Sequence, residues 1–180
     1  PSNGTTDIWQ LDIMRGFLTR LRADPSGHPS HSPLWSPDGS KMVFTFAPKM
    51  WGDLYVKRLD GTQQEDLLLE TTQEKWATDW SLDGRFLLYS SQDPKTGIDI
   101  WALPMDRKAQ PFPVVRTDFD ERLGQFSPDG KWVAYESNDS GRREVYVQPF
   151  PGPGDRLQIS DNGGTQMRWR SDGKELFYIA

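Results

Sequence analysis

The chain has 180 residues, with 21 basic and 26 acidic side chains, two histidines and no cysteine. Without cysteine there is no disulfide, no thiolate nucleophile and no cysteine-based metal site, and a net charge of −5 argues against the clustered basic surface that nucleic-acid binding requires. No apolar run approaches the ~18–20 residues that cross a bilayer, so membrane insertion is not expected.

Two short strands are expected first in the chain, over residues 8–11 and 18–21. The first of them begins in the signature Asp7-Ile8-Trp9, an acid followed by an apolar and an aromatic residue. The signature returns at residues 53–55, 99–101 and 144–146, so it repeats about every 45 residues. A fixed period of this length is typical of repeat architectures, and each copy marks one strand of a repeating unit.

A hairpin turn precedes each later copy of that signature. Trp35-Ser36-Pro37-Asp38-Gly39 returns in related form at residues 80–84, 126–130 and 169–173. Proline presets φ at the first turn position, and glycine takes the left-handed conformation that closes a β-hairpin. We therefore expect positive φ at the four turn glycines, which are Gly39, Gly84, Gly130 and Gly173.

The strand after each turn is apolar at successive positions rather than alternating ones, as in Met42-Val43-Phe44 and Phe86-Leu87-Leu88-Tyr89. An antiparallel strand of this kind is covered on both faces, as in a sheet stacked between two others. Residues 64–70 are also assigned to a strand. They could pass for a helix, but three consecutive leucines lack helical spacing.

These patterns predict an all-β fold class: a β-propeller of four-stranded antiparallel blades, with four repeats per chain, an offset composite blade and no helix. A single domain over 1–180 is expected, with the composite blade formed by 1–33 and 165–180 and with further blades at about 34–78, 79–124 and 125–164. The composite blade would close the ring within one chain as four blades, or between two chains as an eight-bladed homodimer through shared blades.

The hairpin Trp-Ser-Pro-Asp-Gly, an apolar strand and then Asp-Ile-Trp together resemble the propeller repeats of the TolB family, which are WD-like. They are most similar to the repeats behind bacterial serine/threonine protein kinase domains, and more distantly similar to the propellers of prolyl-oligopeptidase-type peptidases. The resemblance covers residues 7–180 and departs at Leu82, which replaces proline, and at Arg170-Ser171, which replace Ser-Pro. It implies a scaffold or sensor domain, and a bacterial periplasmic or extracytoplasmic location is favoured over the cytoplasm.

Catalytic motifs are missing from the sequence. His28 and His31 are its only histidines, and no Gly-x-Ser-x-Gly elbow accompanies them, so a Ser-His-Asp hydrolase is not expected. No Walker sequence or kinase glycine-rich loop is present, which excludes phosphoryl transfer by this chain. No cofactor and no metal site is predicted, because an unsupported His-x-x-His in a loop is a weak ligand set.

The candidate site comes from the positions at which the repeats differ. Four residues before the turn aromatic stand His31, Trp76, Arg122 and Thr165, and one residue before it stand Leu34, Asp79, Gln125 and Arg168. These positions lie where each innermost strand begins, on the axial face of the propeller. Because aromatic and arginine side chains dominate binding energetics, the expected contact residues are His31, Trp76, Asp79, Asp120, Glu121, Arg122 and Arg168.

The leading interpretation is a non-catalytic scaffold or sensor that binds a protein or small-molecule ligand at this axial face. One alternative is a hydrolase or lyase that uses axial carboxylates such as Asp79, or a channel-bound metal ion. Another is the gating propeller of a larger peptidase. The periodic acids Asp7, Asp53, Asp99 and Glu144 occupy repeated positions, so they are predicted to accept backbone N–H bonds at blade edges.

Overall fold

The computed structural model describes residues 6–62 and 64–180, which form strands and turns without any helix. The strands are β1 (Ile8–Asp12), β2 (Phe17–Arg22), β3 (Ser30–Trp35), β4 (Lys41–Phe46), β5 (Asp53–Arg58), β6 (Glu65–Leu69), β7 (Lys75–Trp80), β8 (Phe86–Asp93), β9 (Gly97–Pro104), β10 (Phe112–Val115), β11 (Glu121–Phe126), β12 (Trp132–Ser137), β13 (Glu144–Pro149), β14 (Leu157–Gln158), β15 (Thr165–Trp169) and β16 (Leu176–Ile179). The all-β prediction is confirmed, including the strand in the leucine-rich segment that forms β6.

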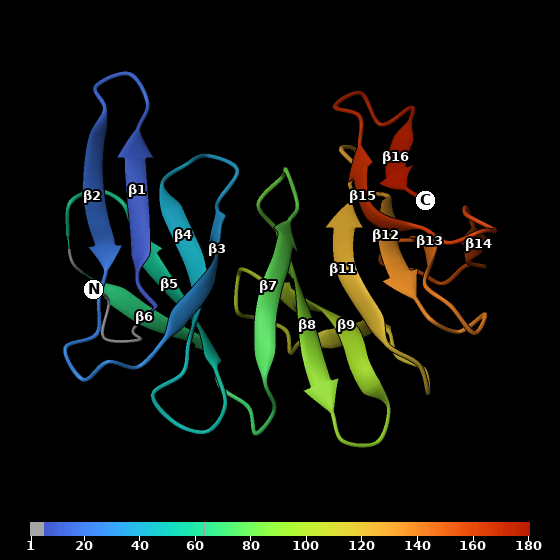
Figure 1. Cartoon of the computed structure of the whole chain (residues 1–180), viewed down its shortest axis with the longest axis horizontal. Coiled ribbons are helices and arrows are strands. Elements are labelled where there is room, and N and C mark those ends of the chain that lie inside the picture. The colour runs from blue at the N-terminus through green and yellow to red at the C-terminus, as the bar shows by residue number, and fades with distance from the viewer. Residues whose placement is uncertain (1–5, 63) are drawn as a thin grey trace.

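Three antiparallel sheets of four strands form the body of the molecule: blade 1 (β3–β6), blade 2 (β7–β10) and blade 3 (β11–β14). Figure 1 shows the blades side by side, with the β1–β2 hairpin at one end and the β15–β16 hairpin at the other. The first strands of neighbouring blades contact each other, β3 with β7 and β7 with β11. These first strands are therefore the innermost strands of a β-propeller arc.

The core lies between the blades, because both faces of each second strand are covered. Val43 packs in one cluster with Leu87, between blades 1 and 2. Its neighbour Phe44 packs with Ile8 of β1 on the opposite side of blade 1. In blade 2, Leu88 likewise faces away from Leu87 and packs toward blade 3. Successive apolar positions thus serve opposite interfaces, as the sequence pattern predicts.

The hairpin turns have the expected backbone. The values of φ are +70° at Gly39, +73° at Gly84, +68° at Gly130 and +72° at Gly173. In blade 1 the Gly39 N–H donates to the Ser36 carbonyl at 2.9 Å, and the Ser36 hydroxyl donates to Asp38 Oδ1 at 2.6 Å. The last turn keeps its glycine N–H bond at 2.9 Å although Arg170 replaces the serine. The glycine is therefore sufficient for the turn, and the serine adds side-chain bonds to it.

The half-blades at the two ends of the chain do not meet. β1–β2 and β15–β16 form separate two-stranded sheets at opposite ends of the arc (Figure 1). Of the two closures considered, the four-bladed ring within one chain is contradicted by this separation. A composite blade shared between two chains stays a prediction.

Each complete blade begins four residues before its expected boundary. The first strands start at Ser30, Lys75 and Glu121, whereas the boundaries were expected at 34, 79 and 125. The expected boundaries follow the turn aromatic, which ends the first strand of a blade rather than starting it, as Trp35 ends β3. The expected boundaries therefore divide β3, β7 and β11 between neighbouring blades.

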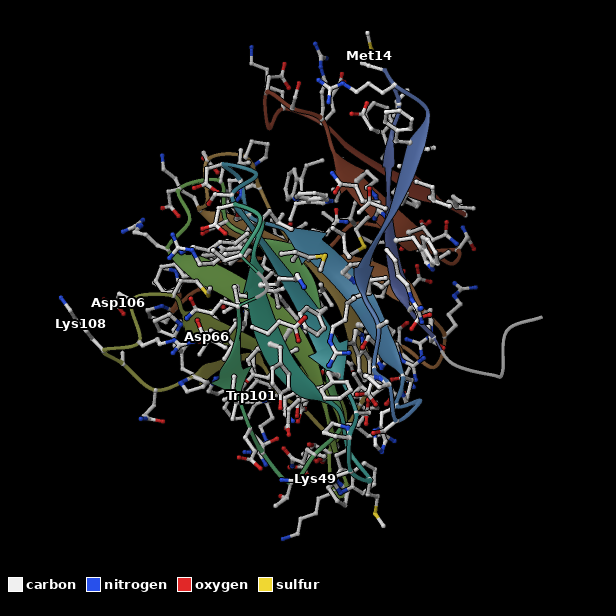
Figure 2. All side chains as sticks on the ribbon, turned by 90° about the vertical axis from the view of Figure 1, so that its left-hand side faces the viewer. Met14, Lys49, Asp66, Trp101, Asp106 and Lys108 are labelled. Carbon is white, nitrogen blue, oxygen red and sulfur yellow. The ribbon has the colours of Figure 1, made fainter. Side chains whose placement is uncertain are left out.

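The propeller has two faces. We call the side with the Asp-Gly turns the hairpin face, and the side where β3, β7, β11 and β15 begin the strand-start face. Figure 2 shows Met14, at the tip of the β1–β2 hairpin, and Lys49, in the loop between β4 and β5, at opposite ends of the molecule. Because β4 runs away from its hairpin turn, the loop of Lys49 belongs to the strand-start face.

Candidate functional site

Each innermost strand carries a bulge shortly after its start. The pairing register shifts between His31 and Leu34 in β3 and at the corresponding place in β7, β11 and β15. Ser32, Leu123 and Gln166 have φ values of 52°, 55° and 54° there. This left-handed conformation costs a non-glycine residue about 1–2 kcal/mol. Because three strands share the feature, it belongs to the framework, and it interrupts the alternation of side chains next to the candidate site.

A charged cluster joins blades 2 and 3 on the strand-start face. Arg122 Nη2 donates to Asp120 Oδ2 at 3.0 Å, and Arg143 Nη2 lies 3.5 Å from the same oxygen. Asp120 Oδ1 accepts from the Ile98 N–H of blade 2 at 3.1 Å, and the Asp120 N–H donates to Asn138 Oδ1 of blade 3 at 2.8 Å. The cluster is therefore fixed to both blades, and it brings together the predicted residues Asp120 and Arg122.

Two guanidinium nitrogens of this cluster have no hydrogen-bond partner among residues 6–62 and 64–180. Arg122 Nε and Arg143 Nη1 are buried and unpartnered, whereas the two side chains as a whole are 40% and 34% exposed. A buried donor without an acceptor costs about 1–3 kcal/mol, and a rotation of either partly exposed side chain that brings the donor to an incoming acceptor would recover part of that free energy. Guanidinium groups match carboxylate geometry, so the cluster favours an anionic group.

His31 and Trp76 stand at the level of Arg122 on the neighbouring innermost strands. His31 Nε2 lies 3.9 Å from Glu74 Oε1, and Glu74 Oε2 accepts from the Gly52 N–H at 2.9 Å. Trp76 is half-buried in β7. Three blades thus contribute a histidine, a tryptophan and an arginine to one face.

Asp79, Gln125 and Arg168 form a second level that is closer to the hairpin face. Asp79 Oδ1 accepts from the Trp80 N–H at 2.9 Å and Oδ2 accepts from the Phe126 N–H at 2.7 Å, so the carboxylate joins β7 to β11. When the Gln125 side-chain amide is oriented so that both its oxygen and its nitrogen form hydrogen bonds, the amide oxygen accepts from Arg168 Nη1 at 2.6 Å. The predicted residues Asp79 and Arg168 therefore belong to one chain of polar contacts across three innermost strands.

Burial raises the pKa of Asp79 to about 6, although the N–H groups of Phe126 and Trp80 and the charge of Arg168 act in the opposite direction. Both carboxylate oxygens are engaged by backbone donors. At the corresponding position of the other innermost strands stand Leu34, Gln125 and Arg168. This level of the described chain thus has one carboxylate, and the paired acids of glycoside cleavage are not formed there.

Glu121 does not reach the axial surface, so its assignment as a contact residue is corrected. Its side chain is 0% exposed, and Oε1 accepts from Thr117 Oγ1 at 2.5 Å. Neighbouring residues of a strand point to opposite sides, so the exposure of Arg122 directs Glu121 inward, into the interface between blades 2 and 3.

The periodic acids, which are Asp7, Asp53, Asp99 and Glu144, have the predicted role in two copies. Asp53 Oδ1 accepts from the Thr71 N–H at 3.3 Å, and Glu144 Oε1 accepts from the Gly163 N–H at 2.9 Å. Asp7 and Asp99 accept from side chains instead, at 2.6 and 2.7 Å. The position is therefore structural, but its partners differ from blade to blade.

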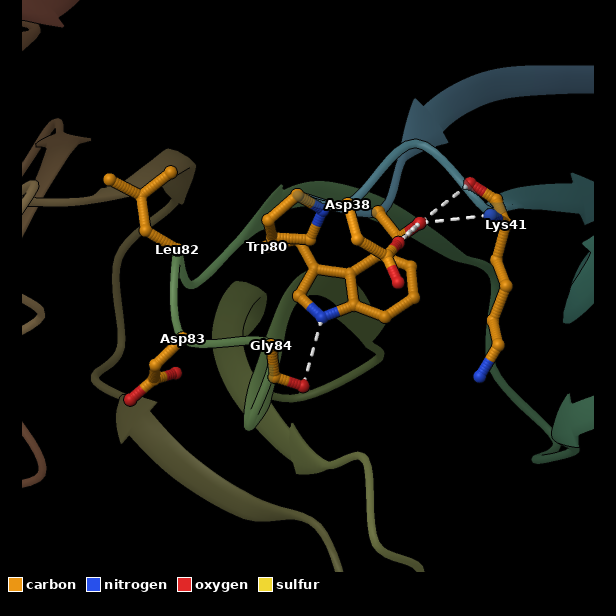
Figure 3. Close-up of a pocket in the computed structure, with 8 residues that line it drawn as sticks. Asp38, Lys41, Trp80, Leu82, Asp83 and Gly84 are labelled. Atoms are coloured by element: carbon orange, nitrogen blue, oxygen red, sulfur yellow. Dashed lines mark hydrogen bonds between the residues drawn. The ribbon is translucent and has the colours of Figure 1, made fainter.

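A pocket of about 370 Å³ opens on the hairpin face between the turns of blades 1 and 2. Figure 3 shows the Trp80 indole between Asp38 and Asp83, with its Nε1 donating to the Gly84 carbonyl at 3.2 Å. Hydrogen bonds from the Ser36 hydroxyl and from Ser40 lower the pKa of Asp38 to about 2. The lining residues are mostly the repeated turn residues, which are occupied in their own hairpins, so this pocket is a weaker candidate.

Within residues 6–62 and 64–180, no three His, Cys, Asp or Glu side chains come together in a group that could hold a metal ion. The two histidines have separate partners, since His28 Nδ1 lies 2.7 Å from Asp24 Oδ2. No helix that could span a membrane occurs in the same part of the chain.

Sequence reasoning missed Arg143 and Glu74, which stand in loops outside the compared positions. Arg143 immediately precedes the periodic acid of blade 3, where the other blades have Gly52 and Ile98. A comparison of that loop position across the repeats would have found the extra charge. Glu74 has no such signal, because its contact with His31 crosses from one blade to the next.

Comparison with solved structures shows the β-propeller fold. TolB from Acinetobacter baumannii superposes with a TM-score of 0.78 at 18% identity, over 96% of this chain and 42% of that chain. A puromycin-hydrolysing peptidase from Mycobacterium tuberculosis gives a TM-score of 0.73 at 16% identity, over 96% and 32%. A chain of the nidogen/laminin complex gives 0.72 at 12% identity, over 98% and 67%. At such identities the likeness extends to the fold alone.

No family model and no curated protein sequence matches the chain. The chain spans 42% of the matched TolB and 32% of the matched peptidase. The activities and partners of those whole proteins are therefore not assigned to this chain.

Proposed function

We propose that the chain is a non-catalytic propeller module that binds a carboxylate-bearing ligand, presented by a protein or a small molecule, on its strand-start face. The observation that carries the proposal is the pair of unpartnered guanidinium nitrogens, Arg122 Nε and Arg143 Nη1, around Asp120. They lie on the face at which the repeats differ, whereas the hairpin face repeats the same residues in each blade.

Two further features support a binding role. His31 and Trp76 add an imidazole and an indole at the level of Arg122, and aromatic and arginine side chains supply much of the free energy of binding at protein interfaces. The similar propeller of the nidogen/laminin complex is described in a complex, so this fold supports protein binding elsewhere. A sensor role in a bacterial extracytoplasmic protein is the finer form of the proposal, and it rests on the resemblance of the repeats.

The enzyme alternative has less support, because Asp79 stands alone at its level and its two oxygens are bonded to backbone N–H groups. The peptidase-gate alternative is supported by the likeness in fold to the puromycin-hydrolysing peptidase. It differs from the proposal in requiring a catalytic domain in addition to these residues.

The test uses the purified chain and an array of acidic, neutral and basic peptides. The wild type is expected to bind acidic peptides, and Arg122→Met is expected to weaken that binding about tenfold or more, because a charge-assisted hydrogen bond of about 1.5–3 kcal/mol is lost. Arg85→Met is the matched control, since Arg85 is an exposed arginine of the hairpin face. Equal loss in both variants, or no preference for acidic peptides, would contradict the proposed site.

The half-blades support a second proposal, a homodimer that shares two composite blades. Trp9 and Leu11 of β1 are 53% and 57% exposed, and Phe177 and Ile179 of β16 are 59% and 57% exposed. In blade 1 the second strand is β4, which corresponds to β16, and it buries Val43 completely. β1 and β16 each have one free edge, so the order β15-β16-β1-β2 between two copies would complete a blade and cover these side chains.

Light scattering tests the shared blade. The chain is expected to have twice its mass of 20.6 kDa, and Phe177→Asp is expected to reduce it to a single mass because a buried unpaired charge opposes pairing. Leu82→Asp is the control, since Leu82 is 66% exposed in a hairpin turn away from both free edges. A single mass for the wild type at high concentration would exclude the pairing.

A further inference from the structure

The interfaces between blades contain a recurring pair of positions. One is the periodic acid on the third strand of a blade, and the other is the residue five before the turn aromatic, at the start of the next blade. In the interface between blades 1 and 2 these positions hold Asp53 and Lys75. Lys75 Nζ donates to Asp53 Oδ1 at 2.7 Å and to the Gly52 carbonyl at 2.8 Å, with the lysine side chain 0% exposed. A cation therefore neutralises the acid in this interface.

The interface between blades 2 and 3 has two acids at the same positions. Asp99 is the periodic acid, and Glu121 stands where the preceding interface has Lys75. Both residues are fully buried. Burial raises the pKa of both carboxyl groups, and the charge of Asp99 raises that of Glu121 further. Two like charges thus replace an ion pair.

One oxygen of each carboxylate lacks a partner. Asp99 Oδ2 accepts from Thr96 Oγ1 at 2.7 Å and Glu121 Oε1 accepts from Thr117 Oγ1 at 2.5 Å, but Asp99 Oδ1 and Glu121 Oε2 have no hydrogen-bond partner in the described chain. The Ser90 hydroxyl is also buried and unpartnered. These three oxygens are hard ligands of the kind that alkaline-earth cations prefer.

Ser90 belongs to the same interface by its position in the repeat. It follows the turn glycine by six residues, as Thr45 does in blade 1, and Thr45 Oγ1 donates to the Lys75 carbonyl of the next blade at 3.1 Å. β8, which carries Ser90, packs against β11.

The charge around the two acids is negative even when the guanidinium of Arg116, which contacts Asp99, is counted. Arg116 Nε lies 3.7 Å from Asp99 Oδ2, and Arg116 Nη2 lies 3.2 Å from Asp93 Oδ2. Asp93, Asp99 and Glu121 against Arg116 leave a formal charge of two negative units when all are ionised. A divalent cation would balance this charge.

The third interface, between blade 3 and β15–β16, shows that two acids are not required by the fold. Glu144 is the periodic acid there and Gly164 takes the partner position. Glu144 Oε1 accepts from Arg142 Nε at 2.7 Å and from the Gly163 N–H at 2.9 Å, and Oε2 accepts from the Ser160 hydroxyl. Both carboxylate oxygens are satisfied, in contrast to Asp99 and Glu121.

We propose that the interface between blades 2 and 3 binds one oxygen-preferring divalent cation of the Ca²⁺ class between Asp99 and Glu121, in the role that the Lys75 ammonium has in the preceding interface. The cation joins the third strand of blade 2 to the first strand of blade 3. It therefore stabilises the arc beneath the cluster of Arg122 and Asp120.

Calorimetric titration and thermal unfolding of the chelator-treated chain test the site, with CaCl2 as the probe. One Ca²⁺ is expected per chain, and saturating CaCl2 is expected to raise the unfolding midpoint by about 5 °C or more over the value in EDTA. Glu121→Gln is expected to lose most of this rise. Glu121→Lys should place an ammonium opposite Asp99, as Lys75 does opposite Asp53, and so give a high midpoint in EDTA with no response to CaCl2.

Glu70→Gln is the matched control, because Glu70 is an exposed acid paired with Lys49 and its loss should leave the Ca²⁺ response unchanged. Asp99→Asn serves as a second variant if Glu121→Lys does not fold, and it is expected to lose the response as Glu121→Gln does. The proposal is overturned if the wild type gains nothing from CaCl2 beyond an equal ionic strength of KCl. It is equally overturned if calorimetry detects no Ca²⁺ binding to the wild type and if Glu121→Gln in EDTA is as stable as the wild type in CaCl2. That result would mean that a proton shared between Asp99 and Glu121 satisfies the two acids.

Discussion

Lys75→Met is expected to lower the free energy of unfolding by about 3–5 kcal/mol, because it removes one partner of a buried ion pair. The lysine side chain is 0% exposed and the Asp53 side chain 6% exposed, with 2.7 Å between Nζ and Oδ1. Methionine is a shorter unbranched side chain that fills most of the same space, so the main effect is the unpaired carboxylate of Asp53. Urea unfolding followed by tryptophan fluorescence measures the change.

Lys49→Met is the control for the loss of a lysine, since Lys49 pairs with Glu70 at 2.8 Å on the surface, where such pairs contribute about 0–1 kcal/mol. Adding Asp53→Leu to Lys75→Met should recover much of the loss, because removal of both charges leaves no buried ion. If Lys75→Met costs no more than Lys49→Met, the ion pair is not a main contact between blades 1 and 2.

Much of the fold was predictable because the repeat is encoded by short local sequence patterns. The Asp-Gly turns need a glycine with positive φ, and the run Met42-Val43-Phe44 needs apolar surroundings on both sides of a strand. Both requirements act within a few residues of sequence. The blade boundaries were displaced by four residues because the strand before the turn aromatic, as at Ser30–Trp35, has few apolar residues to reveal it.

The candidate site was less predictable because it depends on contacts between blades. Asp120 and Arg122 are neighbours in sequence, and they do meet. Arg143 joins them from a loop of the same blade, and His31 meets Glu74 across an interface. Glu121 could be excluded as a surface residue only once the direction of its strand was known. The pairing of the periodic acid Asp53 with Lys75 of the next blade likewise required the fold.

Between pH 4 and pH 7, Asp79 is expected to reduce the stability of the folded chain by on the order of 2 kcal/mol. Its pKa is raised to about 6 by burial, above the 3.8 of an ordinary aspartate. In this window the folded chain holds a proton that the unfolded chain has released, so stability falls as the pH rises. Urea unfolding at several pH values, compared with Asp79→Asn, isolates this contribution.

The stability of Asp79→Asn should not fall with rising pH in this way. The variant also loses a hydrogen bond to Trp80 or Phe126, which lowers its stability by an amount that does not depend on pH. Arg168→Met should shift the fall to higher pH, because the charge of Arg168 lowers the pKa of Asp79. Asp38→Asn is a control of opposite sign: the pKa of Asp38 is lowered to about 2, so its contribution is present above pH 4 and lost as the pH falls toward 2. Parallel pH profiles for the wild type and Asp79→Asn would contradict the raised pKa of Asp79, because a carboxyl group with an ordinary pKa adds no pH dependence between pH 4 and pH 7.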